Sequence, residues 1–146
     1  MAREDLAARF ARITRRLADA ERPVLDRHGL SMWQYVVLSQ LARGPAPAQL
    51  ALAQAIGYDK TRLISLLDEL ERRALILRAP DPHDRRARTI ALTQAGARLH
   101  ATVQRDIHAI EDERLDALDI TERQALQAAL NRLDQHPDTP VKPPSR

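Results

Sequence analysis

Residues 79–93 read APDPHDRRARTIALT, and this stretch decides the fold. It carries three closely spaced arginines: Arg85, Arg86 and Arg88. Runs at 75–77 and 89–93 have the alternating or β-branched pattern of two short strands. Because the interior of a β-ladder does not accept Pro80 and Pro82, the segment predicts a hairpin with a long basic loop. Arginines at the tip of a hairpin suit a narrow minor groove, where the negative potential of DNA is strong.

Two helices are predicted before residue 44. From Leu6 onward, apolar residues recur every three or four positions, which predicts an amphipathic first helix. Pro23 is expected to kink or end this helix, and Gly29 closes the segment. Ser31 and Gln34 have the spacing of a capping box, which starts a second helix running to about residue 43.

A helix-turn-helix pattern follows. Residues 48–56 predict a short third helix that ends at Gly57, and Asp59 is placed to cap a fourth helix. One face of the fourth helix is apolar and is expected to pack inward: Leu63, Leu66, Leu67, Leu70 and Ala74. The opposite face is expected to meet solvent or a groove: Thr61, Ser65 and Arg72, with Arg62 and Ile64 at its edges.

Two helices are predicted after the hairpin. Thr93 is expected to cap a fifth helix that reaches about residue 118 and would be about 35–40 Å long. Its apolar seam consists of Leu99, Val103, Ile107 and Ile110. So small a core would not cover a helix of this length, which indicates a partner. Thr121 and Gln124 predict the capping box of a final helix, and the proline-rich residues 136–146 predict a disordered tail.

Composition restricts the kind of protein. A chain of 146 residues has the length of one domain, and the absence of cysteine excludes disulfides, thiolate metal sites and thiol redox switches. No apolar run has the length of a membrane span and no signal-peptide core is present, so we expect a soluble, cytoplasmic protein. The net charge is only +3, and nearly all of the 23 basic residues are arginine, whose forked side chain suits phosphate and guanine.

The order of the predicted elements is that of a winged helix-turn-helix framed by helices at both ends. Residues 55–76 and 82–96 resemble the MarR family of bacterial transcription regulators. The most specific features are Asp-x-Arg in the hairpin loop, a strand ending Leu-Thr and a glycine three residues further on. The resemblance covers about residues 5–135 and departs at Ala74, where the family usually has glycine.

This resemblance implies a mostly α fold with a small two- or three-stranded β-wing. The implied parts are an N-terminal dimerisation helix at 1–30, a winged helix-turn-helix DNA-binding lobe at 31–93, C-terminal dimerisation helices at 94–135 and a tail at 136–146. It also implies a homodimer without a cofactor, which binds a near-palindromic operator as a repressor and is relieved by a small-molecule effector. Two winged units set one DNA turn apart, about 34–36 Å, would bind one face of the duplex.

The same resemblance assigns roles to particular residues. Arg86 matches the arginine of Asp-x-Arg and is expected in the minor groove, while Asp84 is expected to brace the loop by pairing with an arginine. Arg85 and Arg88 are expected to contact phosphates. The first turns of the fourth helix are expected to reach base edges and the DNA backbone with four side chains: Lys60, Thr61, Arg62 and Ser65.

Two further groups of residues have both a functional and a plainer interpretation. The first group would line a pocket for a small aromatic or anionic effector, although core packing explains its aromatic residues more simply: Arg12, Arg16, Trp33 and Tyr35. The second group has spacings that suit a metal: His100, His108 and Asp112. No complete zinc ligand set is evident, so we predict no metal.

No set of nucleophile, base and orienting residue is recognisable, and no glycine-rich phosphate loop is present. We therefore predict a binding protein and not an enzyme. Two alternatives remain open at this point: a winged-helix module for protein assembly that does not bind DNA, and a metal-responsive regulator that uses His100 and His108.

Overall fold

The computed structural model describes residues 4–136 and is mostly helical with one β-hairpin, which confirms the predicted fold class. The elements are α1 (Leu6–Arg27), α2 (Met32–Ala42), α3 (Gln49–Ile56), α4 (Lys60–Arg72), β1 (Ile76–Pro80), β2 (Arg88–Leu92), α5 (Gln94–Arg114) and α6 (Ile120–Gln135). They form two compact units, residues 1–110 and 111–146. The predicted disordered tail lies outside the described residues, apart from His136.

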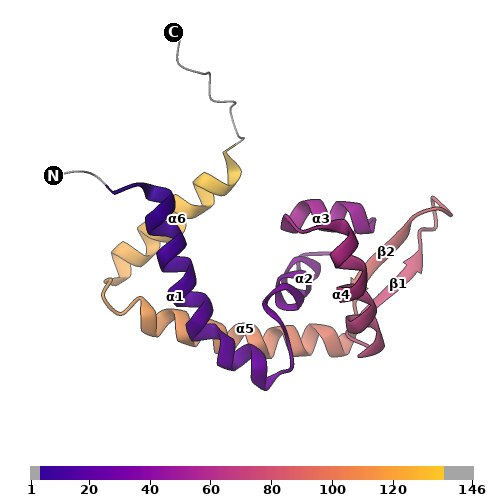
Figure 1. The fold of residues 1–146 in the computed structure, drawn as a ribbon, viewed down its shortest axis with the longest axis horizontal. Coiled ribbons are helices and arrows are strands. Elements are labelled where there is room, and N and C mark those ends of the chain that lie inside the picture. Colours follow the sequence, from indigo (N-terminus) through magenta and orange to yellow (C-terminus); the bar gives the residue numbers. More distant parts are fainter. Residues whose placement is uncertain (1–3, 137–146) are drawn as a thin grey trace, which may run out of the picture. The chain divides into compact units, whose positions relative to one another are not determined.

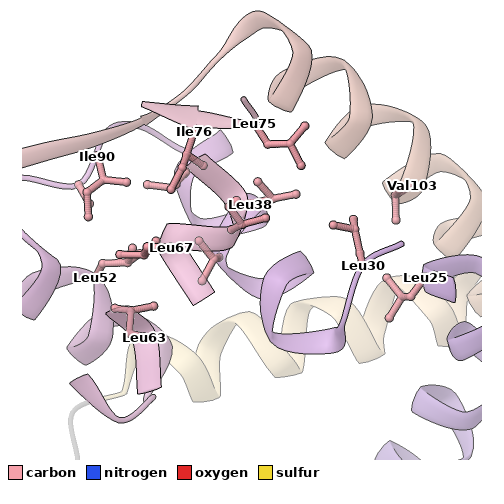
Figure 2. Packing of buried hydrophobic residues seen from close by; sticks show 14 of the residues in the cluster. Leu25, Leu30, Leu38, Leu52, Leu63, Leu67, Leu75, Ile76, Ile90 and Val103 are labelled. Carbon is pink, nitrogen blue, oxygen red and sulfur yellow. The ribbon is translucent and has the colours of Figure 1, made fainter. Parts of the chain in front are cut away.

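The first unit contains the hydrophobic core, to which every one of its helices and both strands contribute (Figure 2). Leu38, Leu52, Leu67 and Ile90 are almost fully buried, and each such side chain stabilises the fold by about 1.5–3 kcal/mol relative to an exposed one. Figure 1 shows the hairpin projecting from the group formed by α2, α3 and α4. The core therefore fixes the hairpin beside the helix-turn-helix.

The core covers the apolar seam of α5, although the sequence analysis expected so small a core not to cover this helix. Val103 and Ile107 are buried, and Leu99 and Ile110 pack against the same core. The helix also ends at Arg114, so that its 21 residues span about 32 Å and not 35–40 Å. The chain's own core covers the seam, and the length of α5 gives no argument for a second subunit.

Capping residues set the starts of α2 and α4 as predicted. Ser31 accepts a hydrogen bond from the Gln34 N–H at 3.1 Å and Gln34 reciprocates at 2.9 Å, which confirms that capping box. Asp59 caps α4 by accepting from the Arg62 N–H at 2.9 Å. Gly57 ends α3 with φ 67°, the left-handed conformation that glycine adopts without strain.

The predicted capping box of the last helix was wrong. Asp119, not Thr121, caps α6: it accepts from the Glu122 N–H at 2.9 Å, and Glu122 accepts from the Asp119 N–H at the same distance. A carboxylate is a charged acceptor that also interacts favourably with the positive end of the helix dipole. The N-cap therefore lies two residues before the threonine, and α6 begins at Ile120.

Pro23 does not end α1, which continues to Arg27. The residue is exposed, and the next two residues, Val24 and Leu25, are buried. Packing of these two side chains holds the helix together across the one backbone hydrogen bond that proline cannot donate.

The hairpin is longer than predicted at its loop end. β1 and β2 are antiparallel, and Pro80 pairs with Arg88 as the last residue of β1. Proline is accepted there because the position is at the end of the ladder. An isolated bridge from Ala46 to Ile90, with N···O distances of 2.8 and 2.9 Å, adds a third backbone segment to the two-stranded sheet.

The junction between α4, β1 and α5 is unusually close. A Cβ built on Gly96 would lie 1.9 Å from the Leu75 carbonyl oxygen, so only glycine fits at this position. Thr93 accepts a hydrogen bond from the Gly96 N–H at 3.0 Å and donates to the Ala74 carbonyl at 2.6 Å. Ala74 itself was wrongly placed on the inward face of α4: it follows the helix, is exposed and has φ 56°.

Candidate nucleic-acid interface

The outward face of α4 carries the four side chains predicted to contact DNA. Lys60, Thr61, Arg62 and Ser65 are all exposed. They point outward because Leu63, Leu67 and Leu70 turn the opposite face of α4 into the core. The result is a helix whose first two turns offer hydroxyl, amine and guanidinium groups to a ligand.

The wing presents its arginines without pairing them. Arg85, Arg86 and Arg88 are exposed, and within residues 4–136 none of their side chains forms an ion pair. Asp84 does not pair with an arginine side chain as predicted; its carboxylate accepts from the Arg86 backbone N–H at 2.9 Å. The two residues are only two positions apart, so this hydrogen bond orders the turn of the loop directly. The guanidinium groups are therefore left available.

Asp81 stabilises the same loop from the other side. Its carboxylate accepts from the His83 N–H at 2.8 Å, and its own N–H donates to the Ala87 carbonyl at 2.9 Å. Two aspartate turns thus hold the wing loop in a defined conformation. An ordered loop loses less entropy on binding than a flexible one.

A shallow cavity of about 340 Å³ joins the wing to the helix-turn-helix. It is lined by Ala48, Gln49 and Leu50 at the start of α3, Lys60 at the start of α4, and Arg86, Ala87 and Arg88 of the wing. Three cationic side chains thus line one cavity that also reaches the N-terminus of α3, whose dipole favours an anion. No side chain caps α3 at Ala48, so its first N–H groups have no side-chain acceptor there. This arrangement suits a phosphate group.

Arg78 is a structural part of this interface that the sequence analysis missed. From β1 it donates to Asp68 and Glu71 of α4, each at 2.5 Å. Burial opposes the charge of Arg78, but the two carboxylates raise its pKa overall. These two ion pairs hold the wing against α4 and neutralise two carboxylates beside the outward face of α4. Spacing along the chain gave no signal for them, since the partners lie on different elements.

Arg73 attaches the other end of α4. Its guanidinium donates to the carbonyls of Gly29 at 2.7 Å and His28 at 3.2 Å, in the turn between α1 and α2. His28 in turn lies 3.6 Å from the Asp106 carboxylate of α5. The position of α4 is therefore set by contacts at both of its ends.

The four residues predicted to form an effector pocket do not come together. Arg12 pairs with Glu4 and lowers the pKa of that carboxyl to about 2, and Arg16 is exposed on α1. Trp33 is 40% exposed and contacts Tyr58 with 4.4 Å between ring centroids and the ring planes tilted by 34°. Tyr35 instead stacks on His100, with 5.6 Å between ring centroids. Residues two positions apart on a helix, such as Trp33 and Tyr35, point in nearly opposite directions.

Of the four, Tyr35 lines a cavity. This cavity has a volume of about 370 Å³ and lies between α2 and α3, with Ser39, Gln40, Arg43 and Ile56 among its lining residues. Arg43 is exposed and brings a cationic group to the cavity.

The three residues whose spacing suits a metal lie in different surroundings. His100 is buried and shares a 3.0 Å hydrogen bond with Ser39, whereas His108 is exposed and Asp112 lies 3.8 Å from Arg123. Within residues 4–136, no three potential ligands lie close enough to hold a metal ion.

A helix-turn-helix with a basic hairpin fixed beside its second helix defines a winged helix-turn-helix protein. Residues 28–87 match the family model described as MarR family. The fold is similar to that of apo MarR from E. coli, with a TM-score of 0.79 and 19% identity over 90% of this chain and 98% of that chain. Residues 28–87 therefore match the MarR family, and the fold over about 90% of the chain is similar to that of a MarR structure.

Two similar structures contain ligands. The transcriptional repressor CouR, bound to a 23-mer DNA duplex, has a TM-score of 0.78 and 26% identity over 90% of this chain and 93% of that chain. NadR in complex with 4-hydroxyphenylacetate has a TM-score of 0.78 and 20% identity over 92% of this chain and 96% of that chain. Within residues 4–136, no helix combines the length and hydropathy needed to cross a bilayer.

Proposed function

We propose that this protein is a cytoplasmic transcriptional repressor, not an enzyme, which binds duplex DNA through α4 and the wing. The observation that carries the proposal is the convergence of Lys60, Arg86 and Arg88 at one cavity that also reaches the N-terminus of α3. Phosphate contacts there position α4, whose outward side chains then meet base edges in the major groove. The CouR complex supports DNA as the ligand of this fold.

The proposal includes a homodimer on a near-palindromic operator. Exposed apolar side chains form one stripe on α1: Leu6, Phe10 and Ile13, each at least 46% exposed. α6 has no buried residue, and Ile120 and Leu133 on it are more than 60% exposed. Such apolar surface is stabilised by burial against a second copy.

A small aromatic or anionic effector completes the proposal. The NadR complex with an aromatic acid supports this class of ligand for the fold. Of the predicted residues, Tyr35 lines a cavity that also contains Arg43, a cation suited to a carboxylate. An effector that favours a different separation of the two α4 helices would lower operator affinity by linkage.

A salt-titrated fluorescence anisotropy series with duplex DNA tests the DNA-binding proposal. Arg86→Ala should weaken binding about tenfold or more and reduce the salt slope by about 1, because one charged phosphate or groove contact is lost. Arg62→Ala should relax base preference by about 1–3 kcal/mol. Arg105→Ala, which removes a 75% exposed guanidinium from α5, is the matched control and should bind as wild type.

Two results would contradict the proposal. Unchanged DNA binding by Arg86→Ala and Arg62→Ala would show that α4 and the wing do not form the DNA interface. Absence of binding to any duplex at low salt would favour the alternative of a winged-helix assembly module.

A further inference from the structure

Ile64 is an apolar residue on the otherwise polar outward face of α4. The residue is 41% exposed, although burial of an isoleucine side chain would stabilise the folded protein. We infer that Ile64 is a specificity residue that contacts the 5-methyl group of a thymine in the major groove. This inference rests on the proposed DNA-binding function and adds a particular base contact to it.

The position of Ile64 on the helix supports a contact with bases. It follows Lys60 by four residues and Thr61 by three, so that it lies one turn further along the same exposed surface. Lys60 lines the cavity of about 340 Å³ shared with the wing. In the proposed complex, a phosphate held at this cavity would direct the next turn of α4 towards the interior of the groove.

The surroundings of Ile64 favour an apolar contact. Asp68, one turn beyond, is paired with Arg78 and so does not repel the DNA as an uncompensated carboxylate would. Isoleucine is branched at Cβ and has few rotamers, so it loses little side-chain entropy on contact. Thymine is the base that offers an apolar group in the major groove, whereas the other bases offer hydrogen-bonding edges alone.

The experiment uses the full chain and begins with selection of bound sequences from a pool of random duplexes. Each thymine of the selected duplex is then replaced by deoxyuridine, which keeps base pairing and removes only the methyl group. When deoxyuridine replaces the contacted thymine, wild type should bind about fourfold more weakly, the value for about one buried methyl group at 0.8 kcal/mol. Only one thymine in each half-site should show this loss. In Ile64→Ala this loss should disappear at that thymine and nowhere else.

A matched control separates this contact from general apolar effects. Leu77 on β1 is also exposed, at 59%, and lies off the α4 surface, so Leu77→Ala should keep the wild-type response to deoxyuridine. Equal responses of wild type and Ile64→Ala at every thymine, or selected half-sites without thymine, would overturn the inference while leaving DNA binding intact. Failure to select any duplex would instead overturn the proposed function and the inference with it.

Discussion

Ala74 adopts a left-handed backbone conformation, with φ 56°, in the turn between α4 and β1. A residue with a Cβ pays about 1–2 kcal/mol in this region, and glycine pays almost none. Ala74→Gly should therefore raise the free energy of unfolding by about 0.5–1 kcal/mol after the added flexibility of the unfolded chain is subtracted.

Urea denaturation measures this change as a shift of the midpoint at constant slope. Ala74→Val, which is branched at Cβ, is the opposing control and should be less stable than wild type. A lower midpoint for Ala74→Gly would contradict the strain at this turn.

Gly96 presents the opposite case, in which a side chain is excluded. Gly96→Ala would place a methyl group 1.9 Å from the Leu75 carbonyl oxygen, so β1 and α5 must move apart. We expect a loss of about 2 kcal/mol or more in the free energy of unfolding, as for other overpacked sites. Thermal and urea unfolding would measure it.

Gln94→Ala in the same first turn of α5 is the control, because Gln94 is exposed and its replacement should change stability by less than about 0.5 kcal/mol. Equal stability of Gly96→Ala and wild type would show that the two backbones are not held in contact.

Among single elements, the packing of α5 against α2 depends on a buried histidine. His100 is 6% exposed, and burial lowers its pKa, with a smaller contribution from the charge of His108. The unfolded chain therefore binds a proton more readily than the folded chain. The free energy of unfolding should fall as the pH drops from about 7 through the unfolded pKa of about 6.5, and level off below the folded pKa.

Chemical denaturation at a series of pH values tests this expectation. In His100→Gln, which has no titrating ring, the decline between about pH 7 and 6 should be smaller than in wild type. Identical pH profiles for the two proteins would show that protonation of His100 does not affect folding.

At the same scale, the sequence predicted elements better than it predicted their limits. The capping residues Ser31 and Asp59 act within one helical turn, so their spacing was sufficient. The spacing of Thr121 and Gln124 predicted the wrong cap for α6, because Asp119, two residues earlier, supplies the acceptor. The extent of β1 was also missed, because pairing with β2 and not composition decides where a strand ends.

For the whole molecule, the central prediction is self-association through the exposed stripe of α1. Phe10 is 46% exposed, and in a symmetric dimer each substitution acts twice. Phe10→Asp should raise the dimer dissociation constant about 100-fold or more, since burial of each aromatic side chain contributes about 1.5–3 kcal/mol. Sedimentation equilibrium measures this constant.

Leu77→Asp is the control for the general effect of a new charge, and it should associate as wild type does. A wild-type protein that stays monomeric at micromolar concentration, or a Phe10→Asp variant that associates normally, would contradict the dimer proposed here. A circular dichroism spectrum equal to that of wild type would show that the variant still folds.

The sequence by itself determined the succession of helices, the helix-turn-helix, the basic hairpin and the family resemblance. These features depend on periodicity, caps and turns, whose interactions reach only three or four residues along the chain. The tertiary structure alone decided that Arg78 neutralises Asp68, that His100 is buried and that the predicted effector residues point apart. These outcomes depend on side chains from distant elements meeting in one core, where packing and desolvation, and not spacing, select the partners.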